Sequence, residues 1–411
     1  MSESVQADVA IIGGGMVGAS LALALADSGL ATVLVEGIPP GSQGQPSFDD
    51  RTTALGNASR RIFEALRVWP DMRSAAAAIT TIHVSDAGRF GFARLHAREQ
   101  GIDAFGYVVP NRVIGAALWR RLQQCQHVRV CAPARPEQVR IESDRVVITL
   151  APGRGSGSPP VHIEARLAVG ADGAHSMLRA SAGIDARIED YEQVAVIANV
   201  RADRAHDGTA YERFTPTGPV AVLPLKDGSY GVIWTARPER AAEILALDDR
   251  SFLRELQERF GWRAGAFIRA GVRASYPLKL TRAATTLSER SVLIGNAAQS
   301  LHPIAGQGFN LGLRDAAMLA ERLVGSPGDP GSRETLEQFG RWREGDRSGV
   351  TRFTDGLVKL FGDTRPGVGA ARNIGLLLFD LLPPAKSALA RVSAGFAGPI
   401  PRLARGLTIR P

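Results

Sequence analysis

The feature that most constrains this sequence is a glycine-rich turn directly after its first apolar stretch. Residues 9–12 are all apolar, the turn is Gly13–Gly18 (GGGMVG), and residues 19–26 are almost entirely alanine and leucine. An apolar stretch without polar alternation predicts a buried parallel strand, and the segment after the turn favours a helix. This order of strand, glycine turn and helix predicts an α/β fold.

The glycines of this turn have the spacing that binds a dinucleotide. Gly13 permits the tight turn, Gly15 lets the backbone approach a pyrophosphate, and Gly18 allows the helix to pack closely on the strand. Met16 and Val17 open the helix, whose first N–H groups and positive dipole end face the phosphates. A turn of this kind also occurs in α/β sheets that bind no nucleotide, so its neighbours decide its meaning.

The next strand supplies the missing partner. Residues 32–35 are predicted to form a second strand, which ends at Glu36. An acid about twenty residues beyond the glycines holds the hydroxyls of a ribose and disfavours a 2′-phosphate. The segment therefore predicts a bound dinucleotide, but it does not separate FAD from NAD.

Two further motifs lie far along the chain. In the first, an apolar segment leads into Asp172 and Gly173, an arrangement that is also compatible with an ordinary turn. In the second, an apolar segment leads to Asn296, and Gly306–Gly308 then opens a helical pattern. Ligands of α/β sheets bind beyond the carboxyl ends of strands, and helix N-termini attract anions. Both motifs are therefore candidate parts of one site.

Composition excludes several functions. The chain has 411 residues, with 49 Lys and Arg against 41 Asp and Glu, but the basic residues are nearly all arginines scattered among acids. We therefore predict no nucleic-acid partner. The two cysteines predict a reducing compartment, no metal site is expected, and no segment reaches the length of a membrane span. The expected location is cytoplasmic, with at most a peripheral contact to the inner membrane.

Taken together, the three motifs resemble the class A FAD-dependent aromatic hydroxylases. Segments 49–55, 214–225 and 295–315 are similar to the ubiquinone-biosynthesis branch of that family, and most similar to its 2-polyprenyl-6-methoxyphenol hydroxylases. The resemblance implies a para-hydroxybenzoate hydroxylase-like fold. It consists of an α/β, Rossmann-type FAD-binding domain, an inserted β-sheet substrate domain and a C-terminal helical tail.

The resemblance also implies domain boundaries. The FAD-binding domain takes residues 1–77, 99–185 and 276–345, the substrate domain takes 78–98 and 186–275, and the C-terminal helical region takes 346–411. The sequence predicts strands at 194–200, 220–224 and 230–235, a helix at 249–260, and a helix over 109–122 that starts near Asn111. Phe214 and Trp234 are candidates either for a hydrophobic substrate pocket or for ordinary sheet core.

Residues from all three motifs are implied to contact FAD. Arg51 and Arg112 are placed near the flavin and its phosphates by the same resemblance, with a solvated surface as the alternative for Arg112. Asn296 stands where the family usually has Asp, so it keeps an acceptor oxygen but loses a charge. The implied cofactor-binding residues are Gly13, Gly15, Met16, Val17, Gly18, Glu36, Arg51, Arg112, Asp172, Gly173, Asn296, Pro303, Gly306, Gln307, Gly308, Phe309 and Asn310.

The implied reaction is hydroxylation of a polyprenylated methoxyphenol in ubiquinone biosynthesis. In the family, NAD(P)H is a transient co-substrate that reduces FAD, O2 forms a C4a-hydroperoxyflavin, and this species hydroxylates the phenol. Pro303 is expected to form a rigid wall beside the flavin, because its φ is fixed and it lacks an N–H. His302 is a candidate base for the phenol, with a purely structural histidine as the alternative.

Two other functions remain open from sequence alone. One is hydroxylation of a smaller, soluble aromatic compound by the same chemistry. The other is a non-catalytic flavoprotein or scaffold in a biosynthetic complex, for which Asn296 gives a weak motive. The arginine-containing tail after residue 386 is a candidate contact for membrane or for other ubiquinone-biosynthesis proteins, and otherwise packs on its own domain.

Overall fold

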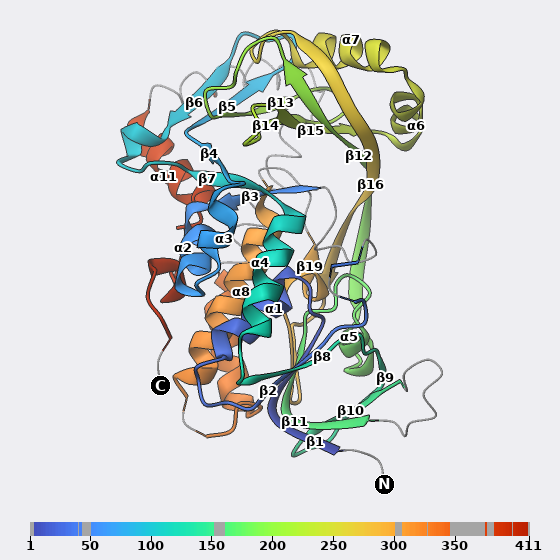
Figure 1. The fold of residues 1–411 in the computed structure, drawn as a ribbon, viewed down its shortest axis with the longest axis vertical. Coiled ribbons are helices and arrows are strands. Elements are labelled where there is room, and N and C mark those ends of the chain that lie inside the picture. The colour runs from blue at the N-terminus through green and yellow to red at the C-terminus, as the bar shows by residue number, and fades with distance from the viewer. Residues whose placement is uncertain are drawn as a thin grey trace.

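The structure is a computed structural model that describes residues 4–39, 41–42, 51–151, 161–300, 306–326, 328–345, 375, 382–396 and 398–409. It has two lobes, each built on an eight-stranded sheet. In Figure 1 the lower lobe contains both chain ends, and the upper lobe carries the second sheet and two helices. A three-stranded sheet lies between them.

The first sheet has the strand order β17-β18-β11-β1-β2-β8, with β9 and β10 attached to β11. Strands β18, β11, β1, β2 and β8 pair in parallel, so their carboxyl ends share one edge. The predicted apolar first strand is buried in this sheet. The strands are β1 (Ser4–Ile12), β2 (Thr32–Val35), β8 (Val128–Cys131), β9 (Pro136–Ile141), β10 (Val146–Leu150), β11 (Val161–Gly170), β17 (Leu287–Ser288) and β18 (Ser291–Leu293).

Helices cover this sheet because their small and apolar residues fit against it. Helix α1 (Met16–Leu25) buries Ala19, Leu21 and Ala22 completely, and lies between α4 (Asn111–Gln123) and α8 (Gln307–Val324) in one hydrophobic cluster. The other face packs on β9, β10 and a short helix. The remaining helices of this lobe are α2 (Asn57–Ala65), α3 (Trp69–Arg73) and α5 (Met177–Ser181), and residues 333–345 are also helical.

The second sheet has the order β19-β16-β12-β15-β14-β13-β5-β6, which confirms a strand-rich insert in the nucleotide-binding frame. Helices α6 (Pro238–Ala246) and α7 (Asp249–Phe260) cover its outer face. Its strands are β5 (Thr81–Asp86), β6 (Phe92–His96), β12 (Ala186–Ala202), β13 (Thr209–Phe214), β14 (Val220–Pro224), β15 (Tyr230–Ala236), β16 (Phe267–Ala283) and β19 (Gln299–Ser300). Strands β12 and β16 are long enough to connect both lobes.

The small middle sheet pairs β3 (Thr52–Gly56) and β4 (Ala77–Ile79) with β7 (Gly106–Pro110). A short 3₁₀ helix, η2 (Ala97–Gln100), follows β6. The α/β fold class with an inserted substrate sheet is therefore confirmed. The exact domain boundaries stay a prediction. The expected loop at 153–160 and the expected helices at 353–361 and 372–382 lie wholly or mainly outside the described residues.

The described part of the tail packs on the lower lobe and, through Ala390 of α11, on the middle sheet and β6. It contains α11 (Pro383–Ser393) and η5 (Leu403–Arg405), and Leu403 is buried. The backbone N–H of Ala58 donates to the Ala394 carbonyl (2.9 Å), and that of Arg402 donates to Glu321 Oε2 (2.6 Å). These contacts favour the expectation that the tail covers its own domain. None of the described helices is both long and apolar enough to cross a bilayer.

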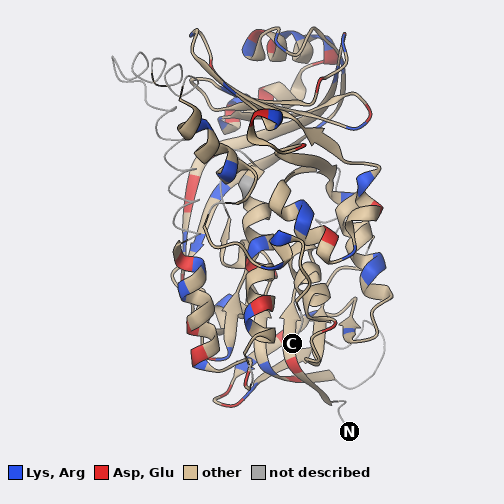
Figure 2. Cartoon of the chain, turned by 90° about the vertical axis from the view of Figure 1, so that its left-hand side faces the viewer, with Lys and Arg blue, Asp and Glu red and all other residues tan. Residues whose placement is uncertain are grey.

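Charged residues are spread over both lobes. In the view of Figure 2, Lys and Arg alternate with Asp and Glu on the helices and on the strand ends. Several of these residues pair locally, as Arg240 does with Glu243 and Arg333 does with Glu337. The positive net charge therefore does not gather into a single stripe on the side shown.

Candidate FAD site

The three sequence motifs meet at one edge of the parallel sheet. Ile12 is paired with both Gly170 and Val35, and Gly170 is paired with Leu293. The residues that follow these four strand ends are therefore neighbours, although they lie up to about 280 positions apart in sequence. This is the edge at which α/β sheets bind ligands.

The first glycine turn is shaped by close backbone contacts. Gly13 has a φ of +104°, and a Cβ there would lie 2.5 Å from the carbonyl oxygen of Ala171. A Cβ on Gly18 would lie 1.9 Å from the carbonyl oxygen of Gly13. Among the described residues, no side chain caps the start of α1. The first N–H groups of this helix therefore remain available to an anion, as the spacing predicts.

Glu36 lies beside this turn. Its Oε2 accepts a hydrogen bond from the Gly14 backbone N–H (2.7 Å), and its Oε1 accepts one from the Ile38 N–H (2.8 Å). The ring of Trp119, on α4, also approaches Gly14, and its Nε1 is buried without a hydrogen-bond partner among the described residues. Sequence reasoning missed Trp119, because only the packing of α4 on α1 brings it here.

The Asp-Gly motif follows β11. Asp172 Oδ2 accepts from the Met177 N–H (2.7 Å), whereas its Oδ1 is buried without a partner among the described residues. Burial raises the pKa of the Asp172 carboxyl above its usual range. Gly173 has a φ of +81° and open space where a Cβ would be. His175, two residues beyond Gly173, is exposed. An unpaired acceptor beside an open glycine fits a ligand with hydroxyl groups.

The third motif reaches the same place through a short 3₁₀ turn, η3 (Gly295–Ala297). A Cβ on Gly295 would lie 3.3 Å from Val17, so this turn packs against the first glycine turn. The side chain of Asn296 is exposed at the turn. Arg179 connects the second and third motifs: its Nη1 donates to the Ala297 carbonyl (3.0 Å), and its Nη2 donates to that of Ala174 (2.6 Å).

The start of α8 is held against the middle sheet. Gly306 has a φ of +60° and lies against Ala54, while Gly308 has open space around it. The Phe309 ring stacks on Phe63, with 6.2 Å between ring centroids. The partly buried Phe309 side chain therefore contributes to the packing of α8 on α2. Gln307 begins α8, but the placement of its side chain lies outside what the structure describes.

The side-chain amide of Asn310 is bound entirely within the protein. Its Oδ1 accepts from the Gly56 N–H (2.8 Å) and from Ser59 Oγ (2.7 Å), and its Nδ2 donates to the carbonyls of Ala54 and Gly306 (2.8 Å each). These four hydrogen bonds use the full capacity of the amide. The Asn310 side chain therefore joins α8 to β3 and α2 and retains no hydrogen-bonding capacity for a flavin.

The two candidate arginines lie at a common junction. Arg51 precedes β3, its guanidinium lies 4.7 Å from the centroid of the Tyr276 ring, and its carbonyl accepts from the Asn111 N–H (2.8 Å). Arg112 follows Asn111 in the sequence and is exposed on the first turn of α4. The structure thus brings Arg51 next to the start of α4. His302 and Pro303 lie outside the described residues.

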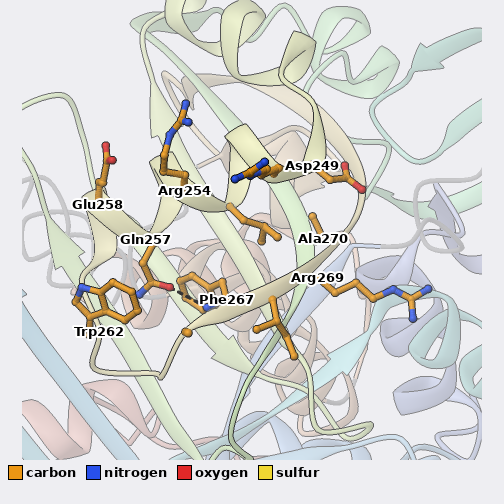
Figure 3. A pocket seen from close by; sticks show the side chains of 12 residues that line it. Asp249, Arg254, Gln257, Glu258, Trp262, Phe267, Arg269 and Ala270 are labelled. Carbon is orange, nitrogen blue, oxygen red and sulfur yellow. Dashed lines mark hydrogen bonds between the residues drawn. The ribbon is translucent and has the colours of Figure 1, made fainter.

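A groove elsewhere on the molecule is not this site. It has a volume of about 610 Å³ and lies between α7 and the first half of β16, on the outer side of the upper lobe (Figure 3). Trp262 and Arg254 line it, whereas no residue of the three motifs does. Trp234 also faces this side and packs on Phe252, with 6.1 Å between ring centroids, so it is sheet core rather than part of a pocket at the glycine turns.

Comparison with known proteins agrees with this geometry. Residues 6–354 match the FAD binding domain family. The ubiquinone hydroxylase UbiL of Rhodospirillum rubrum is 37% identical over 409 residues, which cover 98% of this chain and 94% of the relative. The chain is an FAD-dependent hydroxylase of the ubiquinone-biosynthesis family. It is thus a monooxygenase whose co-substrate is NAD(P)H.

Other relatives of this hydroxylase agree with the family. The 3-demethoxyubiquinol 3-hydroxylase of Escherichia coli is 30% identical over 385 residues, covering 90% of this chain and 94% of the relative. Among solved structures, p-nitrophenol 4-monooxygenase PnpA from Pseudomonas putida aligns with a TM-score of 0.77 at 20% identity, covering 96% of the hydroxylase and 99% of that chain. The latter similarity shows the shared fold.

FAD fits the described residues of the hydroxylase. The glycine turn would be filled by any side chain at Gly13 or Gly18, its helix start carries uncapped N–H groups, and Asp172 presents a buried unpaired oxygen. These features suit a pyrophosphate and the hydroxyls of its attached sugars. The described parts of the three motifs lie together at one sheet edge and are the candidate lining for FAD.

Proposed function

We propose that this hydroxylase adds oxygen to the aromatic ring of a polyprenylated methoxyphenol during ubiquinone biosynthesis. The observation that carries the proposal is the convergence of all three motifs at one edge of the parallel sheet, where the substrate sheet also pairs with β19 beside the third motif. A Cβ on Gly231 of β15 would lie 3.4 Å from Thr52 Oγ1, so the substrate sheet contacts β3. The Ala54 carbonyl on the same strand accepts a hydrogen bond from Asn310, in the first turn of α8. The named activities of the relatives support ubiquinone precursors as the substrate class.

In this proposal each motif holds a different part of FAD. The uncapped start of α1, at Gly15, Met16 and Val17, holds the pyrophosphate, and Glu36 holds the adenosine ribose. Asp172 and Gly173 lie beside the pyrophosphate. Bound FAD supplies the redox chemistry, which is electron transfer from NAD(P)H and activation of O2.

The residues on the flavin side position and shield the reacting groups. Asn296 accepts from a ribityl hydroxyl, and the backbone N–H groups around Gly306, Gln307 and Gly308 stabilise negative charge on the flavin pyrimidine. Arg51 and Arg112 approach the cofactor from the middle sheet. Pro303 borders the reacting face, and His302 is the candidate base for the phenol.

An apolar surround suits a prenylated substrate. Leu223 and Leu225, from β14 and the turn after it, pack with residues of the middle sheet in one hydrophobic cluster. In this proposal the exposed part of Leu223 faces the substrate, and apolar area buried there contributes roughly 25 cal/mol per Å². Because a polyprenyl chain partitions into lipid, we propose that the enzyme acts from the cytoplasm at the surface of the inner membrane.

Complementation tests the proposal directly. A bacterial strain blocked at the methoxyphenol step should regain ubiquinone when it expresses the protein, and the accumulated methoxyphenol should disappear from lipid extracts. Gly15→Val is the matched control, because its side chain fills the approach to the pyrophosphate. If flavin-loaded protein is expressed and the intermediate persists, the proposed substrate is wrong.

A second assay separates the alternatives. Purified protein should oxidise NAD(P)H faster in the presence of the prenylated phenol and yield the hydroxylated product. Stimulation by a small soluble phenol but not by the prenylated one would point to the smaller substrate. Flavin-loaded protein that shows no stimulated oxidation with either compound would point to a non-catalytic flavoprotein.

A further inference from the structure

The turn that presents Asn296 is anchored by a buried carboxylate. Gly295 has a φ of +56°, in the left-handed region, and its backbone N–H donates to Asp315 Oδ2 (3.0 Å). Asp315 lies on α8, and its side chain has no solvent exposure. A Cβ on Gly312, one turn earlier on α8, would lie 3.0 Å from the Gly295 Cα. Helix and turn are therefore in direct contact, and a shift of either moves the other.

The carboxylate is in turn held by an arginine from a distant helix. Arg343 lies in the helical segment 333–345, and its side chain is fully buried. Its Nε and Nη2 lie 2.6 Å and 2.5 Å from Asp315 Oδ1, and its Nη2 also donates to the Leu311 carbonyl (3.3 Å). The two guanidinium nitrogens thus bind Oδ1 as a fork. The other carboxylate oxygen of Asp315, Oδ2, therefore points toward Gly295.

A buried ion pair is weak evidence for a stabilising role. Removing two charges from water costs several kcal/mol per ion, so well-packed apolar residues of similar volume are often equally stable. The pair orients the Asp315 carboxylate, because a planar guanidinium fixes the orientation of the carboxylate that it binds. The oxygen that meets the Gly295 N–H is thus fixed by a residue 48 positions away (343 − 295).

We propose that Asp315 and Arg343 are positioning residues for FAD. They hold the Gly295–Ala297 turn, whose first residue has a left-handed backbone conformation. Through this turn they determine where the Asn296 side chain meets the ribityl chain. Neither residue is proposed to touch the cofactor. The inference rests on the proposed FAD site, in which Asn296 faces the ribityl hydroxyls.

The test uses Arg343→Met, which removes the fork, and Asp315→Asn, which keeps the shape of the side chain. Apoprotein of each variant is titrated with FAD, and the dissociation constant and the visible circular dichroism of bound flavin are measured. Each variant should weaken FAD binding by about 30-fold and alter the dichroism, because misplaced contacts cost this order of magnitude. The double variant should be no weaker than either single one, since both act through the same hydrogen bond.

Two controls separate positioning from general loss of stability. Phe252→Leu, in the core of the upper lobe, should lower the melting temperature but leave the FAD dissociation constant within about twofold. Arg343→Lys keeps the charge without the fork, and it serves as the test variant if Arg343→Met does not fold. We expect Arg343→Lys also to weaken FAD binding and alter the dichroism, more mildly than Arg343→Met.

Wild-type FAD affinity and dichroism in folded Arg343 variants would overturn the proposal. A double variant whose loss of FAD binding equals the sum of the losses in the two single variants would also overturn it. Asn296→Leu distinguishes this failure from failure of the site itself. If Asn296→Leu weakens FAD binding while the Arg343 variants do not, the positioning role is wrong. If Asn296→Leu also binds FAD normally, the placement of the cofactor is wrong.

Discussion

The turn at Gly13 and the turn at Gly295 both pack near Val17, and they keep their shapes by different means. At Gly13, backbone meets backbone, and the contacts leave no room for a Cβ at Gly13 or Gly18. At Gly295, a buried carboxylate on α8 holds the turn, and Arg343 orients that carboxylate. The first turn depends on local sterics, whereas the second depends on charges brought together by the fold.

This difference predicts how each turn responds to substitution. Steric contacts between backbone atoms cannot be relieved by a rotamer change, so a single methyl group there disrupts the turn. Removing one partner of a buried ion pair leaves an uncompensated charge, which costs about 3–5 kcal/mol of stability, but it places no atom in contact with the backbone of the turn. Substitutions at the first turn should therefore have the larger effects.

The largest effect is expected for Gly18→Ala. Its Cβ would lie 1.9 Å from the Gly13 carbonyl oxygen, so α1 must move away from β1. We expect either insoluble protein or an FAD dissociation constant raised by at least about a thousandfold, which corresponds to roughly 4 kcal/mol. Ala22→Gly on the same helix is the control, costing about 1 kcal/mol of stability without loss of FAD. Normal FAD binding by Gly18→Ala would refute the steric account.

A smaller effect is expected for Glu36→Ala. The substitution leaves the Gly14 N–H without its acceptor and removes the carboxylate proposed to hold the ribose. Loss of one such partner costs about 1–3 kcal/mol, or about 5- to 150-fold in FAD affinity measured by titration. Glu137→Ala, on exposed β9, should bind FAD normally. Equal affinities for the two variants would contradict the role of Glu36.

The Asp172 carboxyl offers a test by pH. Its pKa is raised by burial, so between the ordinary and the raised value the folded apoprotein holds a proton that the unfolded chain has released. Its ionisation therefore lowers stability as pH rises through that range. Asp172→Asn should raise the apoprotein melting temperature by about 2–4 °C at pH 7, and the gain should shrink as the pH falls toward about 4.

Thermal unfolding of the apoprotein from acidic to neutral pH checks this expectation, with exposed Asp144→Asn as the control. A pH-independent difference between wild type and Asp172→Asn would mean that burial of the charge is not the cause. In contrast to Asp315, whose buried charge has an arginine partner, Asp172 leaves one oxygen unpaired by the described residues.

The smallest effect is expected for Asn296→Asp, which places the usual family residue in the second turn. A charged acceptor forms a stronger hydrogen bond to a hydroxyl, so the FAD dissociation constant should fall about threefold. Fluorescence titration at low and high salt measures the change. Weaker binding by Asn296→Asp would show that a charge at this exposed position repels the cofactor.

The sequence predicted those parts of the fold that depend on local patterns. The strand at 32–35 and the helix at 249–260 appear with those bounds, because apolar periodicity and helix-forming residues act within a short window. The glycine motifs were also recognisable, since only glycine tolerates the contacts at Gly13 and Gly18. Their convergence at one sheet edge follows from parallel pairing.

Contacts between distant side chains could not be predicted in the same way. Nothing in the sequence around Arg343 points to Asp315, and Trp119 meets Gly14 only because α4 packs on α1. The partners of the Asn310 side chain, which lie in β3, α2 and its own helix, were likewise not predicted. Partners of buried polar groups are chosen by the fold, and sequence spacing does not encode them.

The paired strands β12 and β16 also determine how the lobes move. Each has 17 residues, so at about 3.3 Å per residue each extends roughly 55 Å through both lobes. Their antiparallel ladder runs from Ala186 with Ala283 to Ala202 with Phe267, interrupted by bulges. Relative motion of the two lobes therefore has to bend or twist this ladder, and its bulges are the places where such bending is easiest. Pulling on the upper lobe should strain the lower one, because the ladder transmits the force between them.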